Sequence, residues 1–336
     1  MGAAKVNSHR FCVTLLILFL SLTTGQIGCG RPNQDSAEDL PAIVTEVLGF
    51  EPPGLVPVPF APRLTRTDEA ELAVAISPRL DELVFTRASI DQSGIHFSLM
   101  SSRMVNGLWI DPHQVSFSSE HGEAEAFFDS SGDRLYFYSG HPEPGTENPP
   151  RAMNLWYVER VGEAWGKPVF VGRPDAPIEY GWSGSLLGDD TFYFTARPYE
   201  DRALADIYEV SIREERFGMA QSIGPPVNTK EYTENEPAVA PDGSFIVFYS
   251  AGRPDNLSTK MLGDLYVSFR HDDGGWAEPR HIDEPINSAA EENWPRISHD
   301  GKYLFFSSNR REGSELPDLY WVSAEALEKY RPAISD

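Results

Sequence analysis

The chain contains very little cysteine. Only Cys12 and Cys29 occur among its 336 residues, and both lie near the N-terminus. Everything after Cys29 therefore has no thiol, which excludes disulfides, thiolate nucleophiles and cysteine-based metal sites from that part of the protein.

Positive charge is also scarce. The sequence has 28 Lys and Arg residues against 51 Asp and Glu residues, a net charge of −23. A surface of this sign repels phosphate backbones, so nucleic acid is not an expected partner. The acidic residues are spread along the chain, which favours a well-solvated surface and a monomer.

The sequence contains only one long apolar run. The segment from Phe11 to Leu22 is apolar and follows Lys5 and Arg10, but it is too short to span a bilayer comfortably. This pattern is typical of a signal peptide. The polar stretch that follows, from about residue 30 to 41, predicts a flexible tether.

The residues that end the leader resemble the lipobox of bacterial lipoproteins. In "TTGQIGC" the small residue Gly28 precedes Cys29, although Gln26 occupies a position where the family usually has an aliphatic residue. The resemblance implies cleavage before Cys29 and acylation of that residue, so that the lipid bilayer is contacted through an N-terminal anchor. Ordinary cleavage, with Cys29 left as a free thiol, is the alternative. The expected organisation is a signal peptide at 1–28, a tether at 29–50, a folded domain at 51–325 and a tail at 326–336.

Known enzyme motifs are missing. The sequence has no Gly-x-Ser-x-Gly, no His-Glu-x-x-His, no P-loop and no dinucleotide fingerprint. We therefore expect no cofactor and no metal, and we assign no catalytic residue. The stretch from His271 to Gly275 could suggest Ca²⁺, but a hairpin turn is the simpler interpretation.

What the sequence does have is one sequence motif that is repeated five times. Each copy contains an apolar run that ends on an aromatic residue, and these anchors lie 52 to 58 residues apart: Phe85, Phe137, Phe194, Phe248 and Phe306. A short alternating segment precedes each anchor, and a third apolar segment follows it. Four copies then add a fourth segment that opens with an aromatic residue, namely Trp109, Trp165, Phe217 and Trp276.

Four-stranded units at this period predict an all-β fold, a β-propeller of five blades. The second strand supports this, because in runs such as "RLYFY" both faces are apolar and each sheet must be covered on both sides. The fifth copy has no fourth strand of its own and ends in "AEALEKYRP", which predicts a short polar helix. We expect residues 56–65, "VPVPFAPRLT", to supply the missing strand and close the ring.

The segments "APDGSFIVFYS" and "SHDGKYLFFSSNR" resemble the WD40-like repeat of bacterial periplasmic propellers, the PD40 or TolB-type family. The likeness covers about residues 68–323. Since well-known members of that family have six blades, six are not excluded here. The resemblance implies a binding scaffold in the periplasm or at the cell surface. Each of these segments contains an Asp-Gly step, Asp242-Gly243 and Asp300-Gly301. We interpret both steps as tight turns between the first two strands.

An acidic residue recurs where each first strand begins. These candidates for binding are Glu71, Glu123, Glu179, Glu234 and Glu292. An Arg follows the second strand in four copies, and an Asp opens the third strand in three. Repetition in every copy favours a structural set that ties loops together. A ligand-binding ring of acids is the alternative.

Residues that break the repeat are the other candidates for binding. Trp182 and Trp294 fall on predicted first strands, where an aromatic side chain could contact a sugar or a peptide, or could belong to the core. The sequence thus predicts a binding or scaffold module for a protein or glycan partner. A glycoside hydrolase or lyase with carboxylates at the channel mouth is the alternative.

Overall fold

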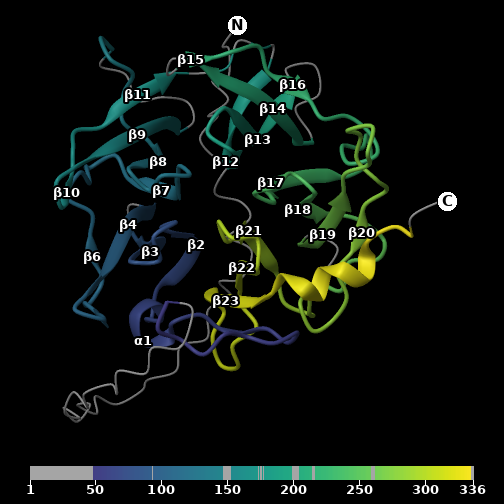
Figure 1. Cartoon of the computed structure of the whole chain (residues 1–336), viewed down its shortest axis with the longest axis horizontal. Coiled ribbons are helices and arrows are strands. Elements are labelled where there is room, and N and C mark those ends of the chain that lie inside the picture. Colours follow the sequence, from purple (N-terminus) through teal and green to yellow (C-terminus); the bar gives the residue numbers. More distant parts are fainter. Residues whose placement is uncertain are drawn as a thin grey trace, which may run out of the picture.

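This computed structural model describes residues 48–92, 94–146, 153–172, 174, 176, 178–198, 204–213, 216–258 and 262–333. The expected signal peptide, Cys29 and most of the expected tether lie outside them. The strands form five antiparallel sheets arranged around a common centre (Figure 1). The protein is a five-bladed β-propeller, as the repeats predict.

In blades 1 to 4 the strands follow the chain from the centre of the ring outward (Figure 1). Blade 1 contains β2 (Ala70–Ile76), β3 (Glu82–Asp91), β4 (Gly94–Val105), β5 (Leu108–Trp109) and β6 (His113–Gln114). Blade 2 contains β7 (Glu123–Phe128), β8 (Arg134–Ser139), β9 (Asn154–Val161), β10 (Ala164–Trp165) and β11 (Val169–Gly172). Blade 3 contains β12 (Ile178–Leu187), β13 (Thr191–Pro198), β14 (Asp206–Arg213), β15 (Arg216–Phe217) and β16 (Gln221–Ser222).

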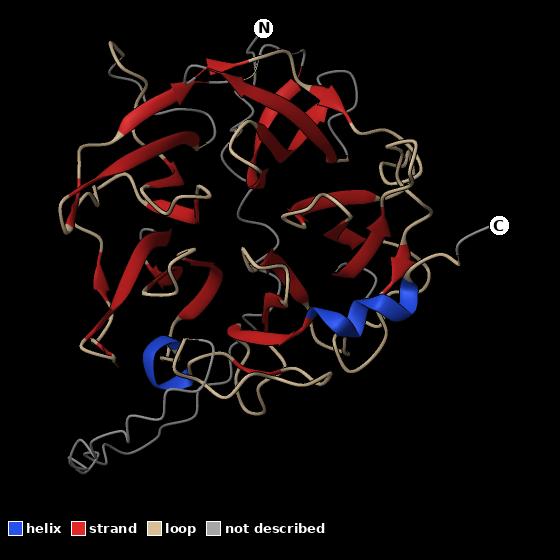
Figure 2. Cartoon of the chain, in the orientation of Figure 1, coloured by secondary structure: helices blue, strands red, loops and turns tan. Residues whose placement is uncertain are grey.

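The last two blades have four strands each. Blade 4 contains β17 (Thr233–Val239), β18 (Phe245–Ala251), β19 (Gly263–Phe269) and β20 (Arg280–His281). Blade 5 contains β21 (Glu292–Ile297), β22 (Tyr303–Ser308), β23 (Asp318–Ser323) and β1 (Val58–Pro59). In blades 1 to 3 the fourth strand is divided into two short pieces that both pair with the third strand. The first strands contact one another from blade to blade around the ring (Figure 2).

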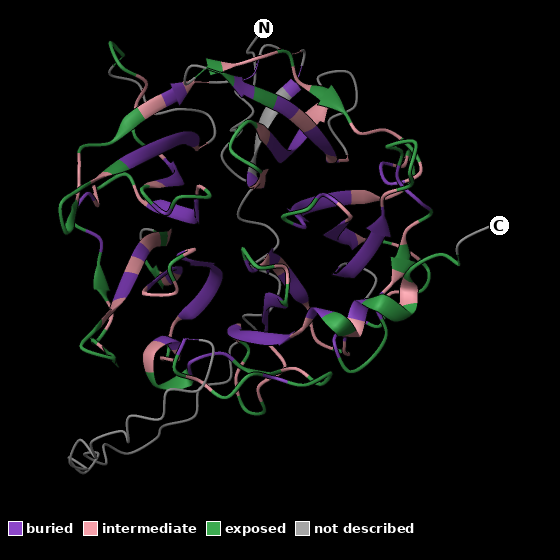
Figure 3. Cartoon of the chain, viewed as in Figure 1, coloured by how far each residue is buried: buried purple, intermediate pink, exposed green. Residues whose placement is uncertain are grey.

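The core lies between the blades. Val84 and Phe85 are neighbours on β3 and are both fully buried, but they belong to different apolar clusters. Val84 packs with blade 2, and Phe85 packs with blade 5. Burying one such side chain contributes about 1.5 to 3 kcal/mol. The two-faced apolar pattern of the second strand is therefore explained by a neighbouring blade on each side (Figure 3).

The ring closes as the sequence predicts, because β1 pairs antiparallel with β23 of blade 5. Phe60 is fully buried behind this strand, with its ring centroid 4.9 Å from that of Phe305 and 5.4 Å from that of Trp321. The paired strand is shorter than the expected 56–65. Residues Pro62–Thr65 form a single helical turn, α1, which begins with a proline that suits the first helical position.

Two segments outside the blades also pack on the ring. The C-terminal 3-10 helix η2 (Ala324–Tyr330) buries Leu327 against blades 4 and 5. Near the other terminus the indole of Trp109 donates a hydrogen bond of 2.7 Å to the carbonyl of Leu48, and Phe50 stacks on the same indole. Among the described residues, no helix has the length and apolar character needed to cross a membrane.

The two ends of the ring have different components. The hairpin end carries the turns between first and second strands, at residues 77–81, 129–133, 188–190, 240–244 and 298–302. Gly243 and Gly301 adopt φ of 71° and 72° there, as expected for the Asp-Gly turns. The loop end carries the connections that lead into the first strands and the long loops after the second strands.

Candidate functional site

The repeated glutamates lie at the loop end, at the start of their first strands. Glu71, Glu123, Glu234 and Glu292 are all buried. Each accepts a hydrogen bond from a hydroxyl group of the connection that precedes its strand, and the donors are Thr67, Ser118, Ser119, Thr229 and Ser288. Each carboxylate therefore fixes the loop between two blades.

Three of these glutamates also contact the arginine that follows the second strand. The N–O distance is 3.4 Å from Arg87 to Glu71. It is 2.8 Å from Arg253 to Glu234 and 2.9 Å from Arg310 to Glu292. Burial with fixed partners favours the structural interpretation over a ring of acids open to a ligand.

Burial also changes the acidity of this set. It raises the pKa of Glu71 and of Glu234 to about 7, although hydrogen bonds from the preceding loop and the nearby guanidinium groups act in the opposite direction. The pKa of Glu292 is raised for the same reason. Desolvation of the carboxylate therefore outweighs its partners at these positions.

The remaining sequence candidates are placed as follows. Glu179 and Trp182 lie on β12, as predicted, but their side chains are outside the described part of the structure. Trp294 lies on β21 and packs against the apolar cluster of blade 1 that contains Leu72 and Ala73. Its indole Nε1 is buried and has no hydrogen-bond partner among the described residues.

Every first strand carries a bulge, and a left-handed residue marks it. These residues have φ between 42° and 61°, and they are Ala73, Glu125, Ser183, Glu236 and Trp294. The strand register shifts at each of these points. Non-glycine residues rarely adopt such φ values, and bulges redirect the local side chain.

The bulges bring charged side chains of separate blades together near the ring axis. Glu125 of blade 2 lies 3.5 Å from the guanidinium of Arg296 in blade 5, and these two blades are not neighbours. The backbone N–H of Trp294 donates a hydrogen bond of 2.6 Å to Glu236 of blade 4. Glu125, Glu236 and Arg296 are all buried. We call these three residues the channel triad.

The two glutamates of the channel triad have raised pKa values. Burial, followed by the charge of Glu125, raises the pKa of Glu236 to about 8. Burial also raises the pKa of Glu125, while the charge of Arg296 lowers it. Ser183 Oγ and Trp294 Nε1 are buried and have no hydrogen-bond partner among the described residues. At neutral pH Glu236 is therefore mostly protonated and uncharged.

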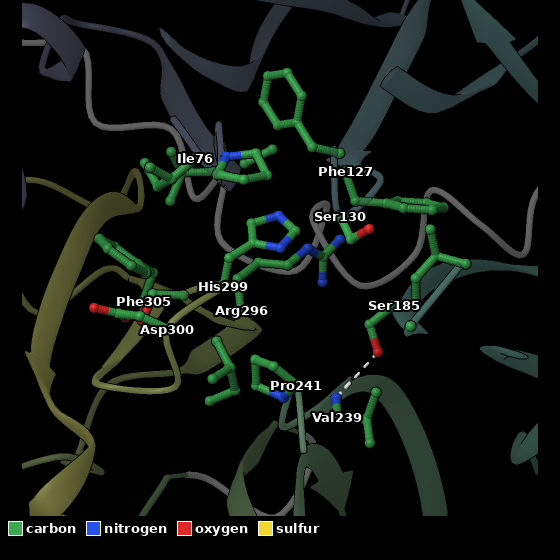
Figure 4. Close-up of a pocket in the computed structure, with 18 residues that line it drawn as sticks. Ile76, Phe127, Ser130, Ser185, Val239, Pro241, Arg296, His299, Asp300 and Phe305 are labelled. Atoms are coloured by element: carbon green, nitrogen blue, oxygen red, sulfur yellow. Dashed lines mark hydrogen bonds between the residues drawn. The ribbon is translucent and has the colours of Figure 1, made fainter. Parts of the chain in front are cut away.

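A cavity of about 390 Å³ opens next to the channel triad, toward the hairpin end. Arg296 forms part of its wall, whereas neither Glu125 nor Glu236 does. His299 and Ser130 lie on hairpins around it, and the imidazole of His299 lies beside the guanidinium of Arg296 in the close-up (Figure 4). Burial lowers the pKa of His299, which favours the neutral imidazole. The rest of the wall is mainly apolar, with Ile76, Phe127, Phe128, Leu186, Val239 and Phe305.

Sequence reasoning missed the channel triad. Glu125 and Glu236 each follow a repeated glutamate by two residues, in "EAEAFF" and "ENEPAV", and the acid at that position occurs in only two copies. An acid that occurs in only two of five copies is not needed to build a blade, so this irregularity could have identified Glu125 and Glu236 as candidate functional residues. Among the described residues no group of three or more His, Cys, Asp or Glu side chains could hold a metal ion.

Comparisons with known proteins concern the fold. No family model matches the sequence, and no curated protein matches it. A putative TolB from Agrobacterium tumefaciens is 18% identical, with a TM-score of 0.44 over 72% of this chain and 71% of that one. A protein of unknown function from Dyadobacter fermentans is 10% identical, with a TM-score of 0.46 over 80% and 97%. An alpha-L-arabinofuranosidase from Lactobacillus brevis is 11% identical, with a TM-score of 0.49 over 78% and 93%. At these identities the similarity is one of fold alone.

Proposed function

We propose that this protein is an exported, lipid-anchored binding module of the bacterial envelope, and that it holds a segment of a protein or glycan partner at the hairpin end of its channel. The observation that carries this proposal is the cavity beside Arg296. It combines apolar walls with a few converging polar groups, which is the usual composition of a binding site.

The position of the carboxyl groups supports binding over hydrolysis. A general acid or base must come within hydrogen-bond reach of the substrate atom that it serves. Arg296 lines the cavity, whereas neither Glu236 nor Glu125, which Arg296 contacts, lines it. The four repeated glutamates whose side chains are described accept hydrogen bonds from hydroxyl groups, and three of them also contact an arginine.

Glycoside hydrolysis is the second candidate function, because Glu125 and Glu236 are two carboxyl groups in one buried site. A pKa of about 8 for Glu236 would suit a proton donor at neutral pH. Release of nitrophenol from aryl glycosides by the wild-type protein, lost in a Glu236→Gln variant, would favour this function. No release from a broad panel of glycosides would count against it.

Photo-cross-linking tests the binding function. A photoreactive amino acid replaces Ser130, which is exposed at the hairpin end, and in the matched control it replaces Glu120, which is exposed at the loop end. Both proteins are irradiated with bacterial envelope extract. We expect a discrete adduct from position 130 alone. Adducts of equal yield from both positions, or from neither, would contradict a partner at the hairpin end.

Cell fractionation tests the anchor. The resemblance at Gly28-Cys29 motivates this part of the proposal. A Cys29→Ser variant should move from the membrane fraction to the aqueous fraction, since its acyl chains would be missing. Equal membrane association of both forms would contradict lipid anchoring.

A further inference from the structure

We infer that the cavity at the hairpin end captures the free C-terminal carboxylate of a protein partner whose last side chain is apolar, with the Arg296 guanidinium as the anion-binding group. This inference rests on the proposed binding function and names the ligand of the same site. It follows from the residues of blade 5 that depart from the repeat, from the unused donors of Arg296 and from the chemistry of the walls.

Arg296 is an exception at its position in the repeat. It pairs with the residue immediately before the aromatic anchor of its second strand, Phe305 before Phe306. The residues with the same pairing in the other blades are Ala75, Phe127, Ser185 and Ala238. A guanidinium is therefore not required to build a blade at this position.

His299 is a second exception in the same blade. It lies in the hairpin two residues after Ile297, and the residues at this place in the other hairpins are Pro78, Ser130, Gly188 and Pro241. All five line the cavity, so they form its rim. Blade 5 thus adds one cationic side chain to the wall and one titratable imidazole to the rim, and the site is asymmetric, as a ligand site usually is.

The guanidinium of Arg296 is buried but poorly satisfied. The whole residue is only 6% exposed. Nη1 donates to the carbonyl of Pro295 at 2.9 Å, and Nη2 reaches Glu125 at 3.5 Å, which is long for a charged pair. Nε is buried without any hydrogen-bond partner among the described residues. A buried donor of this kind gains from an added acceptor.

The surroundings select a planar monoanion. A guanidinium presents two parallel N–H groups that match a carboxylate. A phosphate dianion would place a second negative charge close to Glu125 and is disfavoured. Ser185 Oγ accepts the N–H of Val239 at 3.0 Å and makes no other hydrogen bond among the described residues, so its O–H can donate to a ligand oxygen (Figure 4).

The walls and the volume select a chain end with an apolar side chain. Phe127, Phe305 and Ile76 provide apolar surface that suits an aliphatic or aromatic group better than a sugar ring with many hydroxyls. A volume of about 390 Å³ is near the lower limit of small-molecule sites, so a chain end fits and a folded element does not. The carboxylate of Asp300 on the rim accepts a hydrogen bond from Ser298 at 2.6 Å and keeps its charge, so the ligand carboxylate is expected at Arg296 in the wall and not at the rim.

Calorimetric binding of small probes to the full-length protein tests the inference. N-acetyl-phenylalanine represents the chain end, and N-acetyl-phenylalanine amide is its neutral counterpart. We expect the acid to bind at least about tenfold more tightly than the amide. Equal binding of the two, or no binding of either, would overturn the inference. This comparison needs only wild-type protein, so it is decisive even if a variant fails to fold.

Variants and a second ligand complete the test. Arg296→Gln should remove the preference for the acid, while Lys302→Gln, which removes an exposed cation from the same hairpin, should keep it. A preference that persists in Arg296→Gln would overturn the role of Arg296. Tighter binding of glucuronate than of N-acetyl-phenylalanine would overturn the protein chain end in favour of an acidic glycan. Cross-linking from position 130 together with failure of these probes would leave the binding function standing and reject this ligand.

Discussion

Replacing Glu236 with glutamine should stabilise the protein at alkaline pH. Glu236 is 6% exposed, and burial together with the charge of Glu125 raises its pKa from 4.5 to about 8. The folded protein therefore holds a proton that the unfolded chain releases between these two pH values. Stability from this group is fully present below pH 4.5 and is lost as the pH rises through about 8.

The magnitude follows from the size of the shift. Each pKa unit corresponds to about 1.4 kcal/mol, so ionising Glu236 in the folded state costs about 3 to 5 kcal/mol once part of the cost is shared with Glu125. Glutamine has the same shape as the protonated acid, and its carbonyl can accept the N–H of Trp294 as Glu236 does at 2.6 Å. We expect the two proteins to be similar at pH 5 and the variant to be more stable by that amount at pH 9.

Urea denaturation, followed by tryptophan fluorescence at pH 5, 6, 7, 8 and 9, measures this difference. The raised pKa values of Glu71, Glu234 and Glu291 also make the wild-type protein less stable as pH rises, but they are present in both proteins and cancel in the comparison. Glu120→Gln controls for the loss of one surface carboxylate. The reasoning is refuted if wild type and Glu236→Gln lose the same free energy of unfolding between pH 5 and pH 9.

The fold could be predicted from the sequence because its signal is periodic. The aromatic anchors and the two-faced second strand indicate a sheet covered on both sides, and a propeller satisfies this at every blade. The closing strand could also be predicted, because the fifth copy has no fourth strand and another part of the chain must supply it. The single helical turn at Pro62–Thr65 was missed because three prolines in ten residues also suit an edge strand.

The channel triad could not be predicted in the same way. A regular strand would point Glu123 and Glu125 to the same face, and only the bulge at Glu125, with φ of 52°, separates their environments. Arg296 is 171 residues from Glu125 along the chain, so their contact depends on the closed ring and not on any local pattern. The repeat identifies what builds the blades, and the exceptions to it identify the site.

Two further predictions concern stability. Glu234→Ala and Glu292→Ala should each lower the free energy of unfolding by about 2 to 4 kcal/mol, because each removes the acceptor that holds the preceding loop and leaves a mostly buried arginine without that partner. Glu231→Ala, at an exposed site in the same loop as Glu234, should change little, and losses no larger than this control would favour a ligand-binding role instead. Phe60→Ala should cost about 3 to 5 kcal/mol and lower the melting temperature by about 5 to 10 °C, since Phe60 is fully buried against Phe305. Leu55→Ala is the matched control, because Leu55 is 58% exposed beside the same strand. If the two melting temperatures fall equally in a calorimetric scan, the N-terminal strand does not close the ring, since only a closed ring buries residue 60.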